Sequence, residues 1–271
     1  MPYEMPTIGT RVELRQTFDQ VASLYDQNRP SYPLGVFDDV VTLSGVGPGS
    51  RLLEIGCGTG HATQMLATRG LAIDCIEMGD NMAALARQRL APYPRVNILI
   101  ANFDVWTTSE RYDLVYCATA YHWLNPATRD QRTAALLKPG GQLAIWRNRH
   151  IRNGSCDEFL NEADSIFEEL APELVKRRAH LPRAEEVAEA EREPVSPTIF
   201  EPPVYRLHQW SLPYTAAEYV QMLSTFADFQ LLPPPRRQLL LARIDALIAS
   251  SFGGSVVQDY ATVLQISRKR G

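Results

Sequence analysis

Short apolar runs alternate with amphipathic stretches over residues 51–146. The strand-length apolar runs are 51–55, 72–77, 96–100, 112–117 and 142–146, the last preceded by a predicted turn at Lys138-Pro139-Gly140-Gly141. Apolar residues recur with helical spacing at 61–68, 81–90 and 125–137. Strands that alternate with helices in this way predict a parallel sheet with helices on both faces.

The two ends of the chain have a different texture. Residues 17–25 and a second segment ending at about Leu43 are expected to be helical, separated by an extended stretch around Pro30 and Pro33, because proline fixes φ. A charged helical stretch is predicted over 156–178, followed by the Glu-rich segment 185–193. Both segments favour solvated helices or a mobile cap, not a catalytic carboxylate cluster. The remaining predicted elements are a strand at 204–210, helices at 214–225 and 236–250, and a strand at 258–267 before the basic tail Arg268-Lys269-Arg270.

Composition narrows the class of protein. The 271 residues are 45% apolar and 21% charged, so the chain can bury a core and is not a disordered polymer. This length allows one enlarged domain or two small ones. The formal charge of -4 argues against nucleic acid as a partner, because no net positive field would attract a phosphate backbone.

The cysteines and the N-terminus bear on compartment and metal content. Cys57, Cys75, Cys117 and Cys156 form no CxxC pair and have no histidine at zinc-like spacing, so no metal site is expected. The N-terminal residues are polar and lack the apolar core of a signal peptide, and no run approaches the ~18 apolar residues of a membrane span. These features predict a cytoplasmic protein with no membrane partner.

A glycine-rich loop is the main chemical signal. The segment Glu54-Ile55-Gly56-Cys57-Gly58-Thr59-Gly60 follows a predicted strand and opens a predicted helix, where glycines allow a ligand to approach the backbone closely. Phosphate binding is the weaker interpretation, because His61 stands where the dinucleotide fingerprint has glycine or alanine. Glu77 closes the next strand, where an acid can accept both hydroxyls of a ribose. Together these features indicate an adenosine-type ligand.

At this point the sequence resembles the class I S-adenosylmethionine-dependent methyltransferases, whose first motif is acid-x-G-x-G-x-G. Further matches in family order are Asn102-Phe103, Tyr112-Asp113-Leu114-Val115 and Leu136-Leu137-Lys138-Pro139-Gly140-Gly141. Within that superfamily, the stretch Phe18 to Pro33 and the later Tyr121-His122-Trp123 resemble the trans-aconitate methyltransferase-like group of small-molecule enzymes. The resemblance implies S-adenosylmethionine as the cofactor.

The resemblance implies roles for the residues of the loop. Gly56, Gly58 and Gly60 would line the methionine and ribose portions of the cofactor. Glu54 would anchor the loop or reach the amino group through water. Cys57 could be a nucleophile, but no histidine or aspartate has triad spacing around it, so it is expected to contribute to the cofactor site only through its backbone.

The family also implies contacts beyond the loop. Glu77 would take the ribose hydroxyls and Met78 would pack on adenine. Asn102 stands where relatives often have aspartate, with Phe103 beside it, and an amide can still accept and donate hydrogen bonds. Ala118 would lie by the sulfonium.

The N-terminal segment supplies further candidates. Arg29 is a candidate for the methionine carboxylate, because guanidinium and carboxylate pair bidentately, although a surface salt bridge is the alternative. Tyr25 could close over the cofactor as a lid, and Tyr32 is a candidate for acceptor contact. Plain packing beside prolines is the alternative for both tyrosines.

Acceptor contacts are expected after the fourth and fifth strands. Tyr121, His122 and Trp123 follow the fourth strand, at the carboxyl edge where open α/β sheets bind ligands. His122 could be a general base, or it could only shape the pocket. Arg147 could recognise an acidic acceptor, with a solvated basic turn as the alternative.

The predicted fold is a Rossmann-like α/β fold. It has a seven-stranded, mostly parallel sheet with helices on both faces, an N-terminal helical lid and helical cap insertions. The predicted parts are a lid at 1–45, a cofactor-binding core at 46–150, a helical cap with a returning strand at 151–257, and a closing strand and basic tail at 258–271. We expect these parts to form one integrated domain.

The predicted function is methyl transfer from S-adenosylmethionine to a small-molecule acceptor, by a monomer or homodimer, without a metal. One alternative is a tRNA or protein methyltransferase, which the acidic charge disfavours. A second is a non-catalytic cofactor-binding scaffold, and a third is a nicotinamide dehydrogenase, which the glycine spacing disfavours. The sequence leaves the acceptor and its methylated atom open.

Overall fold

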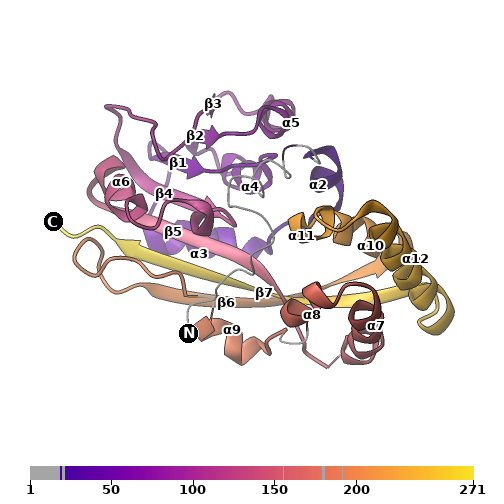
Figure 1. Ribbon diagram of the computed structural model, residues 1–271. Helices are drawn as coiled ribbons and strands as arrows, with labels where there is room; N and C mark the ends of the chain where they lie inside the picture. Colours follow the sequence, from indigo (N-terminus) through magenta and orange to yellow (C-terminus); the bar gives the residue numbers. More distant parts are fainter. Residues whose placement is uncertain (1–18, 20–21, 155, 179–180, 191) are drawn as a thin grey trace. The chain divides into compact units, whose positions relative to one another are not determined.

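The structure is a computed structural model that describes residues 19, 22–154, 156–178, 181–190 and 192–271 (Figure 1). The chain divides into two compact units. Unit 1 comprises 1–29, 150–183 and 211–259, and unit 2 comprises 30–149, 184–210 and 260–271. The division into lid, core, cap and tail stays a prediction. The first part of the predicted helix at 17–25 lies outside the described residues, apart from Asp19, and helix α2 spans Ala22–Asn28.

A seven-stranded sheet with the order β3-β2-β1-β4-β5-β7-β6 forms the centre of unit 2 (Figure 1). Its strands are β1 (Arg51–Ile55), β2 (Ala72–Glu77), β3 (Val96–Ile100), β4 (Tyr112–Ala118), β5 (Leu137–Ile151), β6 (Val204–Thr215) and β7 (Ser255–Arg268). The ends of β5, β6 and β7 continue into unit 1. The β1–β2, β2–β3, β1–β4 and β4–β5 pairs are parallel, which confirms the predicted mostly parallel sheet.

Helices cover both faces of this sheet. Helices α3 (Leu34–Ser44), α4 (His61–Ala67) and α5 (Asp80–Leu90) share one core with Leu114 and Tyr116 of β4. On the other face, Val115 and Cys117 of the same strand pack with α6 (Arg129–Leu136) and the short helix η1 (Tyr121–Trp123). Successive side chains of a strand point to opposite faces of the sheet. A strand that is buried on both faces therefore has a continuous apolar sequence.

The predicted turn at 138–141 lies inside a longer strand. Leu137 pairs with Tyr112 and Gln142 pairs with Leu114, so residues 138–141 stand opposite Asp113 alone. Gly140 adopts a φ of +71° within this bulge. The prediction of a short strand at 142–146 was therefore wrong in extent, because the chain bulges and keeps its pairing where a turn would end it.

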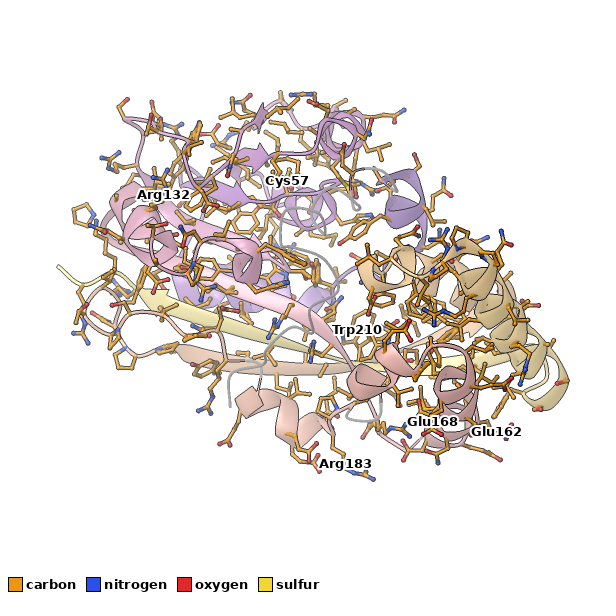
Figure 2. All side chains as sticks on the ribbon, in the orientation of Figure 1. Cys57, Arg132, Glu162, Glu168, Arg183 and Trp210 are labelled. Atoms are coloured by element: carbon orange, nitrogen blue, oxygen red, sulfur yellow. The ribbon has the colours of Figure 1, made fainter. Side chains whose placement is uncertain are left out.

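Unit 1 is mainly helical. Its remaining helices are α7 (Asp157–Leu170), α8 (Pro172–Arg178), α10 (Ala216–Ser224), α11 (Ala227–Gln230) and α12 (Pro234–Ser251). The helical stretch predicted over 156–178 is confirmed and consists of two helices, because Pro172 cannot continue the first helix and begins the second. Glu162 and Glu168 of α7 are exposed, as expected for a charged helix (Figure 2). Helix α12 packs against α7 and α10.

Helix α9 (Ala184–Ala190) belongs to unit 2 and contains most of the Glu-rich segment. Glu185, Glu186 and Glu189 are exposed, in line with the prediction of a solvated helix. Glu193, at the end of the same segment, is different, because its side chain is only 13% exposed and pairs with Arg129. The prediction of solvation was wrong for this residue.

Candidate functional site

The strand order reverses between β1 and β4, since β2 and β3 lie on one side of β1 and β4 and β5 lie on the other. Ligands of open α/β sheets bind outside the carboxyl ends of the strands at such a reversal. The glycine loop after β1, Glu77 at the end of β2 and Ala118 at the end of β4 all meet this edge. The sheet therefore brings the predicted cofactor residues of three strands together.

The three loop glycines have different roles. Gly56, Gly58 and Gly60 adopt φ values of +71°, +55° and +84°. A Cβ on Gly56 would lie 2.7 Å from the Cβ of Ala120, and one on Gly60 would lie 2.9 Å from Leu90 of α5, so both positions are close packing contacts. A Cβ on Gly58 would meet nothing within 4 Å, so this glycine opens onto free space. Gly58 is the position of the loop that leaves room for a ligand.

Glu77 fixes the loop from the neighbouring strand. Its Oε2 accepts a 2.8 Å hydrogen bond from the Gly58 N–H, and its Oε1 accepts 2.9 Å bonds from the N–H groups of Met78 and Gly79. A carboxylate offers about four acceptor positions, so hydroxyl donors can join or replace these amides. The carboxylate thus stands beside the open side of Gly58.

Glu54 is buried at the end of β1, with 1% of its surface exposed. Its Oε2 accepts hydrogen bonds from the Thr63 hydroxyl at 2.5 Å and the Tyr116 hydroxyl at 2.8 Å. Its Oε1 has no hydrogen-bond partner among the described residues. Burial raises the pKa of Glu54 to about 7, against the lowering effect of its two donors. Glu54 therefore anchors α4 and β4 to the loop and retains one unsatisfied acceptor atom.

Cys57 is a buried thiol in the interior beside β1 (Figure 2). Its hydrogen bond with Cys75, together with burial, raises the pKa of the Cys57 thiol well above its ordinary value. Since the thiolate is the nucleophilic form, a raised pKa argues against covalent chemistry at Cys57.

The remaining predicted cofactor residues differ in exposure. Met78 is 46% exposed after β2, and Asn102 is exposed after β3, where its Oδ1 accepts from the Asp104 N–H at 3.0 Å. Phe103 is buried at 4% exposure in the core under α6, and Arg132 lies over its ring. Met78 and Asn102 are accessible to a ligand, whereas the observed contacts of Phe103 are packing contacts.

Thr119, which the sequence did not single out, follows β4 with a φ of +61°. A β-branched residue rarely adopts this left-handed conformation, and such outliers gather at functional sites. Its N–H donates to the Trp146 carbonyl at 2.7 Å, and its hydroxyl lies 2.7 Å from the Tyr32 hydroxyl. Tyr32 therefore contacts the edge of the sheet directly beside Ala118.

A hollow of unit 2 lies beside Thr119. Its volume is about 290 Å³, part of it open to solvent. The lining residues are Thr119, Ala120, Tyr121, His122, Ile145, Trp146, Arg147, Glu193, Val263 and Gln265. The structure thus brings together Tyr121, His122 and Arg147, three of the predicted acceptor residues.

The acceptor candidates have distinct surroundings. The Tyr121 hydroxyl donates to Asp130 at 2.7 Å, and burial raises the pKa of Tyr121. His122 is half-buried, with the Trp123 ring centroid 4.9 Å from its own. Trp123 does not line the hollow. Arg147 lies within β5, so the alternative of a basic turn was wrong.

Tyr25 and Arg29 belong to unit 1. There the Arg29 guanidinium lies 4.0 Å from the ring centroid of Phe226 and 5.2 Å from that of Tyr25. Its Nη2 donates to the Thr225 carbonyl at 3.3 Å, and its buried Nε has no partner among the described residues. The roles of both residues at the cofactor stay predictions.

Comparison with known proteins agrees with this geometry. Residues 52–141 match the family described as the methyltransferase domain, and this segment contains the glycine loop, Glu77 and β4. The segment is a class I methyltransferase domain. The resemblance inferred from the motifs is thereby confirmed, and the matched segment ends within β5.

Individual relatives match parts of the chain. An uncharacterised methyltransferase of Mycobacterium tuberculosis is 30% identical over 151 residues, which is 55% of this chain and 60% of the relative. A trans-aconitate 2-methyltransferase of Methylobacterium radiotolerans is 34% identical over 94 residues, 34% of this chain and 36% of that protein. The chain spans less than two thirds of the length of these relatives.

A solved structure shares the fold. It is a phosphoethanolamine N-methyltransferase of Haemonchus contortus in complex with phosphomonomethylethanolamine and S-adenosylhomocysteine, with a TM-score of 0.54 and 17% identity. The match covers 98% of this chain and 62% of that chain. At this identity the likeness concerns the fold of the methyltransferase domain.

Two kinds of feature are absent from the described residues. They contain no group of three His, Cys, Asp or Glu side chains placed to hold a metal ion. Nor does any described helix have the length and apolar character needed to cross a membrane.

Proposed function

We propose that this chain is an enzyme that transfers the methyl group of S-adenosylmethionine to a small-molecule acceptor. The observation that carries the proposal is the contact of Glu77 with the N–H of Gly58, next to the space that this glycine leaves open, inside a methyltransferase domain. This arrangement offers a carboxylate for hydroxyl groups and a backbone that a ligand can approach.

The residues present fit S-adenosylmethionine. Glu77 would hold ribose hydroxyls, Met78 and Asn102 would flank the adenine, and the unsatisfied Oε1 of Glu54 would accept from the amino group, directly or through water. Ala118, at the end of β4, would lie by the sulfonium. When bound, the cofactor supplies a methyl group already activated by its sulfonium.

The hollow beside Thr119 is the proposed acceptor site. It lies beside the end of β4, and Tyr121, His122 and Arg147, three of the predicted acceptor residues, line it. The relative from Methylobacterium radiotolerans bears the name of an enzyme that acts on trans-aconitate, which supports a small acceptor. His122 contacts the acceptor from η1, either as a general base or as a wall of the site.

Cofactor binding and turnover test the proposal together. We expect calorimetry to show binding of S-adenosylmethionine, and Glu77→Ala to weaken it about 10- to 100-fold, because a charged acceptor of the ribose is lost. Glu110→Ala is the matched control, since Glu110 is an exposed acid paired with Arg51. Labelled methyl groups should pass into the small-molecule fraction of a cell extract.

Each outcome has a separate meaning. Absence of cofactor binding by the unaltered chain would refute the proposal. Unchanged affinity in Glu77→Ala would refute the ribose assignment. Cofactor binding without transfer to any fraction would favour the scaffold, and transfer into tRNA or protein would favour the macromolecular alternative. The cytoplasmic location of the protein stays a prediction, and so does its oligomeric state, a monomer or a homodimer.

A further inference from the structure

Glu193 is held against β7 by its own backbone. Its N–H donates to the Gln265 Oε1 at 3.0 Å, and its carbonyl accepts from the Gln265 Nε2 at 2.9 Å. Gln265 is buried at 3% exposure. A side-chain amide that bonds both backbone groups of one residue fixes the position of that residue. The site of the Glu193 side chain is therefore determined by β7.

Arg129 holds the carboxylate itself. Its Nη2 lies 2.7 Å from the Glu193 Oε1, and only 7% of the Arg129 side chain is exposed. The same guanidinium donates to the carbonyls of Tyr121 and Pro194, and its Cζ lies 4.5 Å from the Tyr121 ring centroid. A buried ion pair is stable only when its geometry is good and its other donors are satisfied, as they are here. The carboxylate is thus fixed before any ligand binds.

Glu193 is one of the residues that line the hollow, together with His122 and Arg147. Arg129 occupies one of the roughly four acceptor positions of the Glu193 carboxylate, whose side chain is 13% exposed, so the carboxylate can still accept further hydrogen bonds. Arg147 adds a cationic residue to the same lining, and Ile145 and Val263 add apolar residues. One anionic and one cationic residue therefore line one small space.

We infer that Glu193 is a specificity residue of the acceptor site, and that the acceptor is a small acid that also carries a hydroxyl or amino group. The acid group pairs with Arg147, and the hydroxyl or amino group donates to Glu193. The inference rests on the proposed function, because it treats the hollow as the acceptor site. Glu193 and Gln265 lie outside the matched segment 52–141, so this selectivity belongs to the rest of the chain.

Paired ligands test the inference on the full chain. The pairs are 3-hydroxybutyrate with butyrate, 4-aminobutyrate with butyrate, and malate with succinate, titrated in the presence and absence of S-adenosylhomocysteine. We expect the hydroxy or amino member of each pair to bind at least about 10-fold more tightly, because a fixed polar group disfavours a ligand that leaves it unpaired. In Glu193→Gln the preference should fall below about 3-fold, since the charge-assisted bond is lost.

Glu201→Gln is the matched control, because the Glu201 side chain is exposed on the segment that follows Glu193. It should keep the preference of the unaltered chain. If Glu193→Gln fails to fold, Glu193→Asp replaces it, since aspartate keeps the charge and withdraws the carboxylate by one methylene. The expected result is then a reduced preference with an intact fold.

The inference is overturned if none of these acids binds, if the members of each pair bind equally, or if the Glu193 variant keeps the preference. S-Adenosylhomocysteine affinity is read separately, by calorimetry. Failure of the unaltered chain to bind S-adenosylhomocysteine counts against the proposed function. The binding of the paired acids decides the role of Glu193.

Discussion

At the scale of single residues, the pKa of Glu54 is set by two opposing effects, hydrogen bonding and burial. Thr63 and Tyr116 both donate to the Glu54 Oε2 and favour the charged carboxylate. Burial outweighs these donors, and the nearby charge of Glu77 adds repulsion, so the pKa of Glu54 rises to about 7. Both protonation states of this acid are therefore populated near neutral pH.

The raised pKa predicts a pH-dependent contribution to stability. The pKa of Glu54 is about 7 in the folded chain, whereas the ordinary pKa of a glutamate is 4.5. A raised pKa stabilises the folded state below pH ~4.5, and this contribution is lost as pH rises through ~7. The change is about 3 kcal/mol at most. Glu54→Gln should therefore gain stability relative to the unaltered chain across this range, as measured by urea unfolding.

Glu218 provides a control of opposite sign. It is exposed, and hydrogen bonds from Thr215 lower its pKa. Its contribution is present above its ordinary pKa and is lost as pH falls, so Glu218→Gln should not reproduce the effect of Glu54→Gln. A stability difference between Glu54→Gln and the unaltered chain that stays constant with pH would contradict the raised pKa.

At the scale of elements, the loop between β1 and α4 contains glycines needed for packing and one glycine that leaves room for a ligand. Gly56 and Gly60 exclude side chains because Ala120 and Leu90 lie against them. Gly58 has the same left-handed backbone without any neighbour at its Cβ position. A substitution at Gly58 therefore strains the backbone without disturbing the core.

Gly58→Ala is predicted to remain folded and to lose cofactor affinity. Alanine in the left-handed region costs roughly 1–2 kcal/mol, and its methyl group would fill the space that Gly58 leaves open. Gly70→Ala is the matched control, because Gly70 has a φ of +75° and also meets nothing within 4 Å. Urea unfolding should give similar losses for both variants. Calorimetry should show at least about a 10-fold weaker affinity for S-adenosylmethionine in Gly58→Ala alone.

How well the bounds of a helix or strand could be predicted depended on its local surroundings. The strands at 51–55, 72–77 and 96–100 were predicted at their observed bounds, because short apolar runs between polar turns indicate buried parallel strands. The error at 138–141 came from backbone geometry. A bulge can keep a strand paired through a turn-like sequence.

The residues of the candidate site could be predicted only where they belong to a recognisable sequence motif. Glu54 and Glu77 stand at strand ends and Gly58 lies in the loop after β1, so their spacing was informative before the fold was known. Glu193 was assigned to a solvated segment because its partner, Arg129, is distant in sequence and the pair forms only in the folded unit. The left-handed backbone of Thr119 has no signature in the sequence, since threonine rarely adopts it.

At the scale of the whole molecule, the basic tail bears on the macromolecular alternative. Lys269 donates to the Leu137 carbonyl at 3.1 Å, and Arg270 donates to the Pro197 carbonyl at 2.8 Å. Arg268 lies 3.5 Å from the Gly140 carbonyl. The cations of the tail are thus engaged by carbonyl groups within unit 2.

This engagement and the net charge of -4 predict that the chain does not methylate tRNA. Binding to a polyanion requires cations that neutralise phosphates, and its affinity falls steeply with salt. With labelled S-adenosylmethionine and bulk tRNA at low salt, incorporation should not exceed that of the heat-inactivated protein. Incorporation that disappears between about 50 and 200 mM salt would show phosphate contacts and contradict the prediction. A positive signal from the small-molecule fraction in the same experiment ensures that a negative tRNA result reflects selectivity and not an inactive protein.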